Sequence, residues 1–290
     1  MESDGLCGGL IDGFLHVLID ERERDHMYSL ITGASRGIGE SFARVLASEG
    51  HSLILVARDF IALTALKESL VAEWGVMIKI ISIDLRDPNA ARMIFERTQQ
   101  EGWDVDCLIS NAGFGRFGEF ESHPVDDYLE MIQVNVTAPM ALSHYLLGPM
   151  KTRGQGTIIH VASMAAFQPT PYMTVYGATK AFLRAFSEGL TGENQANGIQ
   201  IVTVCPGLTD TKFFEAAGAE LEKTLHGAPG MLSPEVVVKA SLKAVRKGTM
   251  TVVPGIKNQL MAMLSSAIPH RIGVPLAARI LGRQFHQSKE

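Results

Sequence analysis

Short apolar runs alternate with helical patterns along most of this chain. The expected strands are residues 28–32 (YSLIT), 52–57 (SLILVA), 77–83 (MIKIISI), 105–110 (VDCLIS), 156–163 (GTIIHVAS), 199–206 (IQIVTVCP) and 250–254 (MTVVP). The expected helices are one that ends at Gly50 and residues 60–74, 88–100, 125–150 and 175–196. The strands are nearly continuous in apolar residues, as expected where helices cover both faces of a parallel sheet. This alternation predicts an α/β fold, with a doubly wound, mostly parallel seven-stranded sheet and helices on both faces, in a single domain.

Two segments lie outside this alternation. Residues 1–26 carry the charge run DERERDH, which indicates a solvated N-terminal extension, and Met27 is a candidate natural start. Residues 256–290 have a helical pattern and form a C-terminal tail. We therefore expect a Rossmann-type domain over residues 27–255 with an extension at each end.

The tail has apolar residues at helical spacing, followed by arginines. The apolar positions are Ile256, Leu260, Met263 and Leu264, and the arginines are Arg271, Arg279 and Arg283. Three arrangements fit this pattern. In order of expectation, the apolar face packs on its own domain, docks a second subunit, or lies on a membrane surface with the arginines at the headgroups.

Composition excludes several classes of function. Hydrophobic residues make up 46% and charged residues 20% of the chain, which is typical of a globular protein. The net charge is −5 and no basic run occurs, so nucleic acid is not an expected partner. Cys7, Cys107 and Cys205 are far apart and form no CxxC motif, so we expect no metal site, no disulfide framework and a reducing cytoplasm. The acidic N-terminus does not fit a secretory signal.

A glycine-rich turn follows the first expected strand. In TGASRGIG, Gly33, Gly37 and Gly39 separate that strand from the helix it opens. Glycines allow the backbone to approach a diphosphate, and the helix N-terminus attracts its charge. A tight strand-to-helix turn also favours glycine without any ligand, so the motif alone leaves both interpretations open.

Arginines near this turn favour a phosphorylated dinucleotide. The acid that binds a ribose 2′-hydroxyl is expected at the end of the second strand, where this chain has Arg58 followed by Asp59. Arg58 and Arg36 can pair with a 2′-phosphate, which predicts NADP(H) rather than NAD(H). The alternative is a solvated Arg58, and Asp59 is interpreted as a helix N-cap.

Three polar residues point to proton transfer. Tyr176 and Lys180 in VYGATKAF lie four positions apart, so they share one face of a helix. A nearby ammonium is expected to lower the tyrosine pKa and to make the phenol a general acid or base. Ser163 ends an expected strand, where open α/β sheets bind ligands, and its hydroxyl can donate to a carbonyl oxygen.

Taken together, these motifs resemble the short-chain dehydrogenase/reductase family over residues 27–254. The matching pieces are TGASRGIG (32–39), SNAG (110–113), Asn135 in MIQVNVTAP, Ser163 in HVASMAA, YGATK (176–180) and CPGLTDT (205–211). They follow the family's order and spacing. Ser110 stands where the family usually has asparagine, which affects little because either residue can bond backbone there.

The resemblance implies a role for each matching residue. Tyr176 is the acid/base, Lys180 holds the nicotinamide ribose, Ser163 orients the carbonyl, and Asn135 binds a water that links Lys180 to solvent. The cofactor-binding set that it implies comprises Gly33, Ser35, Arg36, Gly37, Ile38, Gly39, Arg58, Asp84, Asn111, Gly113, Tyr176, Lys180, Pro206, Gly207 and Thr211. Within it, Asp84 faces the adenine, and Asn111 and Gly113 line the adenine-ribose side. The family commonly forms homodimers or homotetramers.

Other candidates carry less weight. His160 alternates along a strand and is interpreted as a satisfied core histidine, and Cys205 as a small hydrophobe. The expected function is hydride transfer between NADP(H) and a small-molecule ketone or secondary alcohol. Residues 212–232, with Phe213, Phe214 and Leu232, and the run LMAML (260–264) are candidates for an apolar wall facing a 3-oxoacyl chain or a steroid-like ring. An equal alternative is that they only cover the sheet, and an alternative function is a non-catalytic dinucleotide sensor or scaffold.

Overall fold

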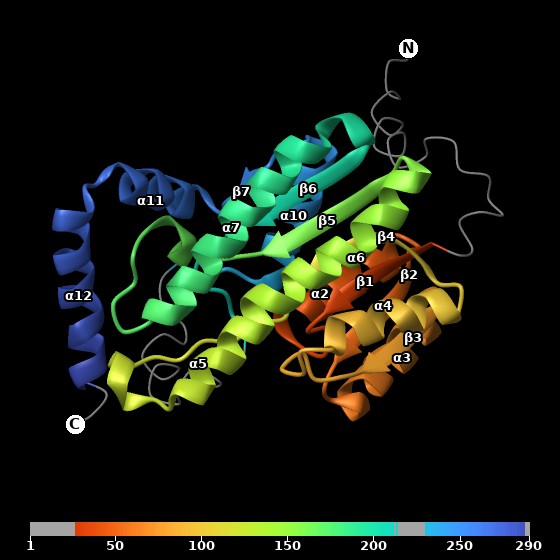
Figure 1. The fold of residues 1–290 in the computed structure, drawn as a ribbon, viewed down its shortest axis with the longest axis horizontal. Helices are drawn as coiled ribbons and strands as arrows, with labels where there is room; N and C mark the ends of the chain where they lie inside the picture. Colours follow the sequence, from red (N-terminus) through yellow and green to blue (C-terminus); the bar gives the residue numbers. More distant parts are fainter. Residues whose placement is uncertain (1–26, 212, 214–229, 288–290) are drawn as a thin grey trace, which may run out of the picture.

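The computed structural model describes residues 27–211, 213 and 230–287, which form one twisted parallel sheet with helices on both faces (Figure 1). The sheet has seven strands in the order β3-β2-β1-β4-β5-β6-β7, and every pairing between neighbours is parallel. The strands are β1 (Met27–Thr32), β2 (Ser52–Ala57), β3 (Ile78–Ser82), β4 (Asp104–Ser110), β5 (Gly156–Val161), β6 (Ile199–Val204) and β7 (Thr251–Val252). The predicted fold class is confirmed.

Two apolar layers hold the sheet between the helices. The helices of the domain are α2 (Gly37–Ser48), α3 (Phe60–Trp74), α4 (Ala90–Gln100), α5 (Val125–Ile132), α6 (Ala138–Arg153), α7 (Thr174–Asn194) and α10 (Pro234–Arg246). One buried cluster joins the sheet to α2, α3 and α10, and a second joins it to α4 and α6. Because both faces are buried, the strands need the nearly continuous apolar sequences from which they were predicted.

Several element bounds differ from the sequence predictions at the carboxyl edge of the sheet. The last three predicted strands, 156–163, 199–206 and 250–254, end earlier, at Val161, Val204 and Val252. There the chain leaves the ladder, so Ser163 and Pro206 lie in loops rather than in strands. The bounds of β2 and α3 agree with the prediction. Short 3-10 helices follow β5 and α7, namely η3 (Met164–Phe167) and η4 (Gln195–Asn197), and η1 (Phe120–Ser122) precedes α5.

The long helix expected over residues 125–150 is interrupted. Between α5 and α6 the backbone forms a π-helical segment, η2 (Gln133–Thr137). A π segment inserts an extra residue into the helical repeat and is frequent at functional sites. Hydrophobic periodicity does not reveal it, because the apolar pattern on either side stays helical.

The tail follows β7 as two helices, α11 (Ile256–Ala267) and α12 (His270–Gln287), which lie along one edge of the molecule (Figure 1). All four apolar positions predicted from helical spacing in α11 are more than half exposed. The tail therefore contacts its own domain, as first expected, since α11 touches η3, but not through these four apolar side chains. The division into an N-terminal extension (1–26), a catalytic domain (27–255) and a C-terminal tail (256–290) remains a prediction. The N-terminal extension, Cys7, Phe214 and most of residues 212–232 lie outside the described residues.

No helix within the described ranges is long and apolar enough to cross a bilayer.

Candidate active site

The glycine turn between β1 and α2 is tightly built. Gly33 and Gly37 have φ values of +66° and +61°, which glycine adopts without strain. A Cβ placed at Gly39 would overlap the carbonyl oxygen of Gly33. This close backbone approach explains why the helix opens with glycine, although glycine is a poor helix former. The backbone cradle and the N-terminus of α2 fit a diphosphate.

Asn111 fixes this turn to the end of β4. Its backbone N–H donates to the Thr32 hydroxyl (3.0 Å), and its side-chain amide donates to the carbonyl oxygens of Thr32 (3.0 Å) and Gly33 (3.3 Å). The contacts of Asn111 are thus with the chain itself, and it shapes the cradle. Gly113 lies further along this loop, where a Cβ would come within 3.1 Å of Asn135 Oδ1 and 3.2 Å of Lys180 Nζ. The loop therefore joins the turn to the catalytic candidates.

Positive charge gathers where β2 ends. Arg58 Nη1 lies 3.8 Å from Asp84 Oδ2, and 59% of the Arg58 side chain is exposed. Arg86, which sequence reasoning missed, pairs with Asp84 much more closely, at 2.6 Å. Burial acts to raise the pKa of Asp84, but the hydrogen bonds and charge of Arg86 outweigh it, and the pKa lies below its ordinary value. Arg86 also pairs with Glu130 (3.2 Å), so two carboxylates share it. Arg58 and Arg36 are both exposed and can be reached by another anion.

The three catalytic candidates converge beyond β5. Tyr176 and Lys180 project from α7 and are 8% and 4% exposed. The Lys180 ammonium donates to the Val161 carbonyl oxygen at the end of β5 (2.9 Å) and lies 5.8 Å from the Tyr176 ring centroid. Ser163 follows Val161 by two residues; its hydroxyl accepts from the Ala165 N–H (3.1 Å), and its side chain acts to lower the pKa of Tyr176. The tyrosine–lysine spacing thus puts both groups on the helix face that was predicted.

The electrostatics of this cluster differ from the sequence prediction. Burial raises the pKa of Tyr176 to about 12; the Ser163 side chain only partly opposes this rise, and Cys205 adds to it. Burial lowers the pKa of Lys180 to about 8. The expected lowering of the tyrosine pKa by the ammonium is therefore wrong for this geometry, because desolvation of the phenol dominates. At neutral pH the phenol carries its proton.

Asn135 sits in the π segment and is fully buried. Its side-chain amide is bonded twice to Phe114, since Oδ1 accepts from the Phe114 N–H (3.1 Å) and Nδ2 donates to the Phe114 carbonyl oxygen (2.9 Å). Nδ2 also donates to the Thr179 hydroxyl (3.1 Å). These bonds hold the loop after Gly113 against α7, next to Lys180. Both polar atoms of the Asn135 side chain are thus hydrogen-bonded to the protein. The role of Asn135 in binding a water that links Lys180 to solvent remains a prediction.

The loop after β6 closes the cluster from the other side. The backbone N–H of Met164, next to Ser163, donates to the Pro206 carbonyl oxygen (2.9 Å). A Cβ at Gly207 would come within 2.7 Å of Asn258 on α11, and a Cβ at Gly37 would meet Thr211 at 3.0 Å. The segment with Pro206, Gly207 and Thr211 therefore spans from the catalytic candidates to the glycine turn, and its contact with the nicotinamide remains a prediction.

An apolar wall adjoins Tyr176. The Phe213 ring centroid lies 5.3 Å from that of Tyr176. A Cβ at Gly115 would touch Phe213, Met173 and Tyr176, each at 3.2–3.3 Å. Leu232 bridges to Thr209 in the loop after β6. The run at residues 260–264 contributes less than expected, since its leucines and methionines are 53–70% exposed.

His160 is fully buried on β5, beside α6 and α7. Its Nε2 lies 3.0 Å from the Ser143 hydroxyl, whereas its Nδ1 has no partner among the described residues. The prediction of a core histidine is thus confirmed, but only one of its two ring nitrogens has a hydrogen-bond partner among the described residues. Burial lowers its pKa from 6.5 to about 3, helped by the charge of Lys180, so the imidazole is neutral.

This buried imidazole predicts acid sensitivity. The unfolded chain protonates His160 near pH 6.5 and the folded protein only near pH 3, so its contribution to stability is present above pH 6.5 and is lost as pH falls toward 3. Between pH 7.5 and 5.5 the expected loss in the free energy of unfolding is about 1.4 kcal/mol. Urea unfolding of His160→Gln at both pH values should lack this loss. The exposed His144→Gln should keep it, and equal losses in both variants would contradict the assignment.

Cys205 adjoins the cluster but carries no chemistry of its own. It is fully buried, and burial raises the pKa of its thiol to about 12, so it is no thiolate at neutral pH. The interpretation as a small hydrophobe agrees with this. Among the described residues no group of His, Cys, Asp and Glu side chains could hold a metal ion.

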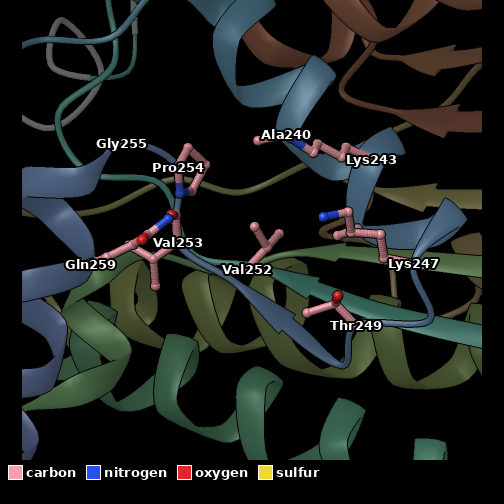
Figure 2. Close-up of a pocket in the computed structure, with 10 residues that line it drawn as sticks. Ala240, Lys243, Lys247, Thr249, Val252, Val253, Pro254, Gly255 and Gln259 are labelled. Atoms are coloured by element: carbon pink, nitrogen blue, oxygen red, sulfur yellow. The ribbon is translucent and has the colours of Figure 1, made fainter.

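A separate hollow lies on the outer edge of the sheet (Figure 2). Lys243 of α10 and Lys247, the residue that follows α10, approach it from one side, and Val252 and Gln259 line it from β7 and α11. None of the catalytic candidates lines it. We therefore place the candidate active site at the carboxyl ends of β1, β4, β5 and β6 instead, where open α/β sheets bind their ligands.

Comparison with known proteins agrees with this architecture. A family model described as short chain dehydrogenase matches residues 28–222. The ketoacyl reductase HetN of Nostoc sp. (strain PCC 7120) is 31% identical over 227 residues, covering 77% of each chain. The very-long-chain 3-oxoacyl-CoA reductase-A of Danio rerio is 31% identical over 222 residues, which cover 75% of this chain and 66% of that protein.

Solved structures give the same result. A short-chain dehydrogenase from Sphingobium yanoikuyae, solved in complex with NADPH, superposes with a TM-score of 0.73 at 30% sequence identity. The match covers 83% of this chain and 96% of that chain. The similarity thus extends over the sheet, its helices and the loops that carry the site.

Proposed function

Since this chain belongs to the short-chain dehydrogenase family of oxidoreductases, we propose that it reduces a ketone with NADPH and that Tyr176 delivers the proton. The observation that carries this proposal is the cluster of buried Tyr176 and Lys180 with half-buried Ser163, which the loop containing Gly113 joins to the glycine turn. A phenol with a pKa of about 12 holds its proton at neutral pH and can give it up to an oxygen that gains charge.

The cofactor residues are proposed on their fit to a dinucleotide. Gly33, Gly37 and Gly39 let the turn pack closely at the N-terminus of α2, where a diphosphate would bind, flanked by Ser35 and Ile38. The arginines at positions 36 and 58 are the candidates for a 2′-phosphate, which supports NADP(H). When bound, the nicotinamide supplies or accepts the hydride.

The chain's own residues then have distinct tasks. The Ser163 hydroxyl donates to the carbonyl oxygen and keeps it beside the phenol of Tyr176. Lys180, held by the Val161 carbonyl, keeps a positive charge near the phenolate that remains after proton transfer. Asn135 fixes the loop that lies against both.

We propose a lipophilic ketone as the substrate. Phe213, Met173 and Tyr176 form an apolar wall next to the cluster, and two relatives are named as ketoacyl and very-long-chain 3-oxoacyl-CoA reductases. A homodimer or homotetramer and a cytoplasmic location are kept as predictions from the family resemblance and from cysteine usage.

The proposed function is tested by following NADPH oxidation against 3-oxoacyl thioesters, steroid ketones, simple aliphatic ketones and sugar ketones. We expect turnover with a 3-oxoacyl or steroid ketone and little with sugar ketones. Exclusive turnover of sugar ketones would contradict the apolar site. Tight NADPH binding without turnover of any of these compounds would indicate a dinucleotide sensor instead.

Arg58 gives a separate prediction on cofactor choice. Arg58→Ala should weaken NADPH binding by roughly ten- to hundred-fold, because one charge-assisted contact to the 2′-phosphate is lost. NADH binding should stay unchanged, since NADH has no such phosphate. Fluorescence titration of both cofactors measures this, with Arg44→Ala as a control because Arg44 pairs with Glu40 on the surface of α2. An equal loss for both cofactors would remove Arg58 from the specificity site.

A further inference from the structure

The first tail helix turns its apolar side outward. Positions 256, 260, 263 and 264 share one helical face. Their exposed fractions are 84% for Ile256, 57% for Leu260, 70% for Met263 and 53% for Leu264. Of the twelve residues in α11, only Ala262 is buried. A helix whose task is to complete the core buries its apolar side, so this stripe serves another purpose.

The second tail helix repeats this arrangement while it is docked on the domain. Gly282 is buried, and a Cβ there would come within 2.8 Å of the Tyr172 hydroxyl, so the helix touches the loop before α7. Its outward apolar positions recur every four residues, with exposed fractions of 56% for Ile272, 50% for Leu276 and 53% for Ile280. Helix α12 therefore contacts the domain through one side and exposes apolar residues on its outer side.

The tail is also cationic. Lys257, Arg271 and Arg279 are exposed, and the sequence from 256 to 287 holds no Asp or Glu, whereas the whole chain has a net charge of −5. Arg271 and Arg279 each precede an outward apolar residue, Ile272 and Ile280. Successive helical residues are about 100° apart, so the cationic and apolar stripes lie side by side on the outer surface.

We infer that α11 and α12 form a docking surface for an anionic lipid bilayer, with the apolar stripes in the interfacial region and the cations at the headgroups. An apolar face flanked by Lys and Arg is the pattern of helices that lie in a membrane interface. A twofold contact with a second copy would bring the same cations face to face, which disfavours that occupant. Anionic headgroups complement the charge as well as the apolar stripe.

Co-flotation of the full chain with vesicles tests this inference. The protein should float with phosphatidylcholine vesicles that contain phosphatidylglycerol and remain unbound with phosphatidylcholine alone. Arg271→Gln combined with Arg279→Gln should lower the partition coefficient roughly thirty-fold, since each cation near an anionic surface contributes about five-fold. Leu276→Gln combined with Ile280→Gln should lower it by about ten-fold or more.

Matched variants remove the same charge or apolar area elsewhere. Arg44→Gln with Arg92→Gln removes two exposed arginines, and Phe60→Gln with Ile61→Gln removes two exposed apolar side chains of α3. Both controls should bind like the unaltered protein. Equal binding to vesicles with and without phosphatidylglycerol, or equal losses in the controls, would overturn the inference. So would absence of flotation together with a concentration-dependent dimer that the tail variants abolish.

Discussion

Replacing Tyr176 with phenylalanine is expected to lower kcat for ketone reduction by roughly 10²- to 10⁴-fold, the usual contribution of a positioned general acid. The ring of Tyr176 is buried against Phe213. Phenylalanine keeps the ring packing and removes only the proton that is delivered. The NADPH dissociation constant should therefore change little, and single-turnover absorbance measurements should locate the loss in the chemical step.

Two comparisons separate this role from a packing effect. Tyr145→Phe removes a phenol from α6, where the ring stacks on Phe95 outside the site, and it should leave kcat unchanged. The pH profile of the unaltered enzyme gives a second test. Because burial raises the pKa of Tyr176 to about 12, the phenol stays protonated and reduction should not decline through loss of this proton between pH 7 and 9. Comparable kcat values for Tyr176→Phe and the unaltered enzyme would remove Tyr176 from the mechanism.

The fold was readily predictable because its signals are local. Buried parallel strands need continuous apolar runs, and helices between them need periodic ones, so β2 and α3 were located to the residue. The π segment between α5 and α6 was not predictable in this way. It depends on tertiary contacts, such as the bonds between Asn135 and Phe114, which hydrophobic periodicity does not encode.

The shared helix face of Tyr176 and Lys180 was predictable from the sequence, but their electrostatics were not. The spacing of Tyr176 and Lys180 fixed their common helix face, but not how far each is desolvated. In the structure burial dominates, so the tyrosine pKa rises, against the prediction from the neighbouring ammonium. Arg86 was missed because its partner Asp84 is only two residues away in a loop, where no periodic pattern marks an ion pair.

Replacing Gly39 with alanine should destabilise the protein by about 3 kcal/mol or more, at the upper end of what overpacking costs. Helix propensity alone predicts the opposite sign, since Gly39 is helical and alanine is the better helix former by about 1 kcal/mol. The added methyl group, however, would overlap the Gly33 carbonyl oxygen and approach Asn111 Nδ2 at 2.6 Å. The Gly33 oxygen is backbone and cannot rotate away, so the turn itself must move.

Gly192→Ala is the matched control for the direction of this change in stability. Gly192 also lies within a helix, α7, and a Cβ there would meet nothing within 4 Å. Alanine should therefore stabilise the protein by about 0.5–1 kcal/mol through helix propensity alone. Urea unfolding at fixed pH gives both free energies. Destabilisation by Gly39→Ala should be accompanied by weaker NADPH binding, because the displaced turn is the proposed diphosphate cradle, whereas Gly192→Ala should bind NADPH normally. If Gly39→Ala were stabilising, as Gly192→Ala should be, the contact with the Gly33 carbonyl oxygen would not be what requires glycine at position 39.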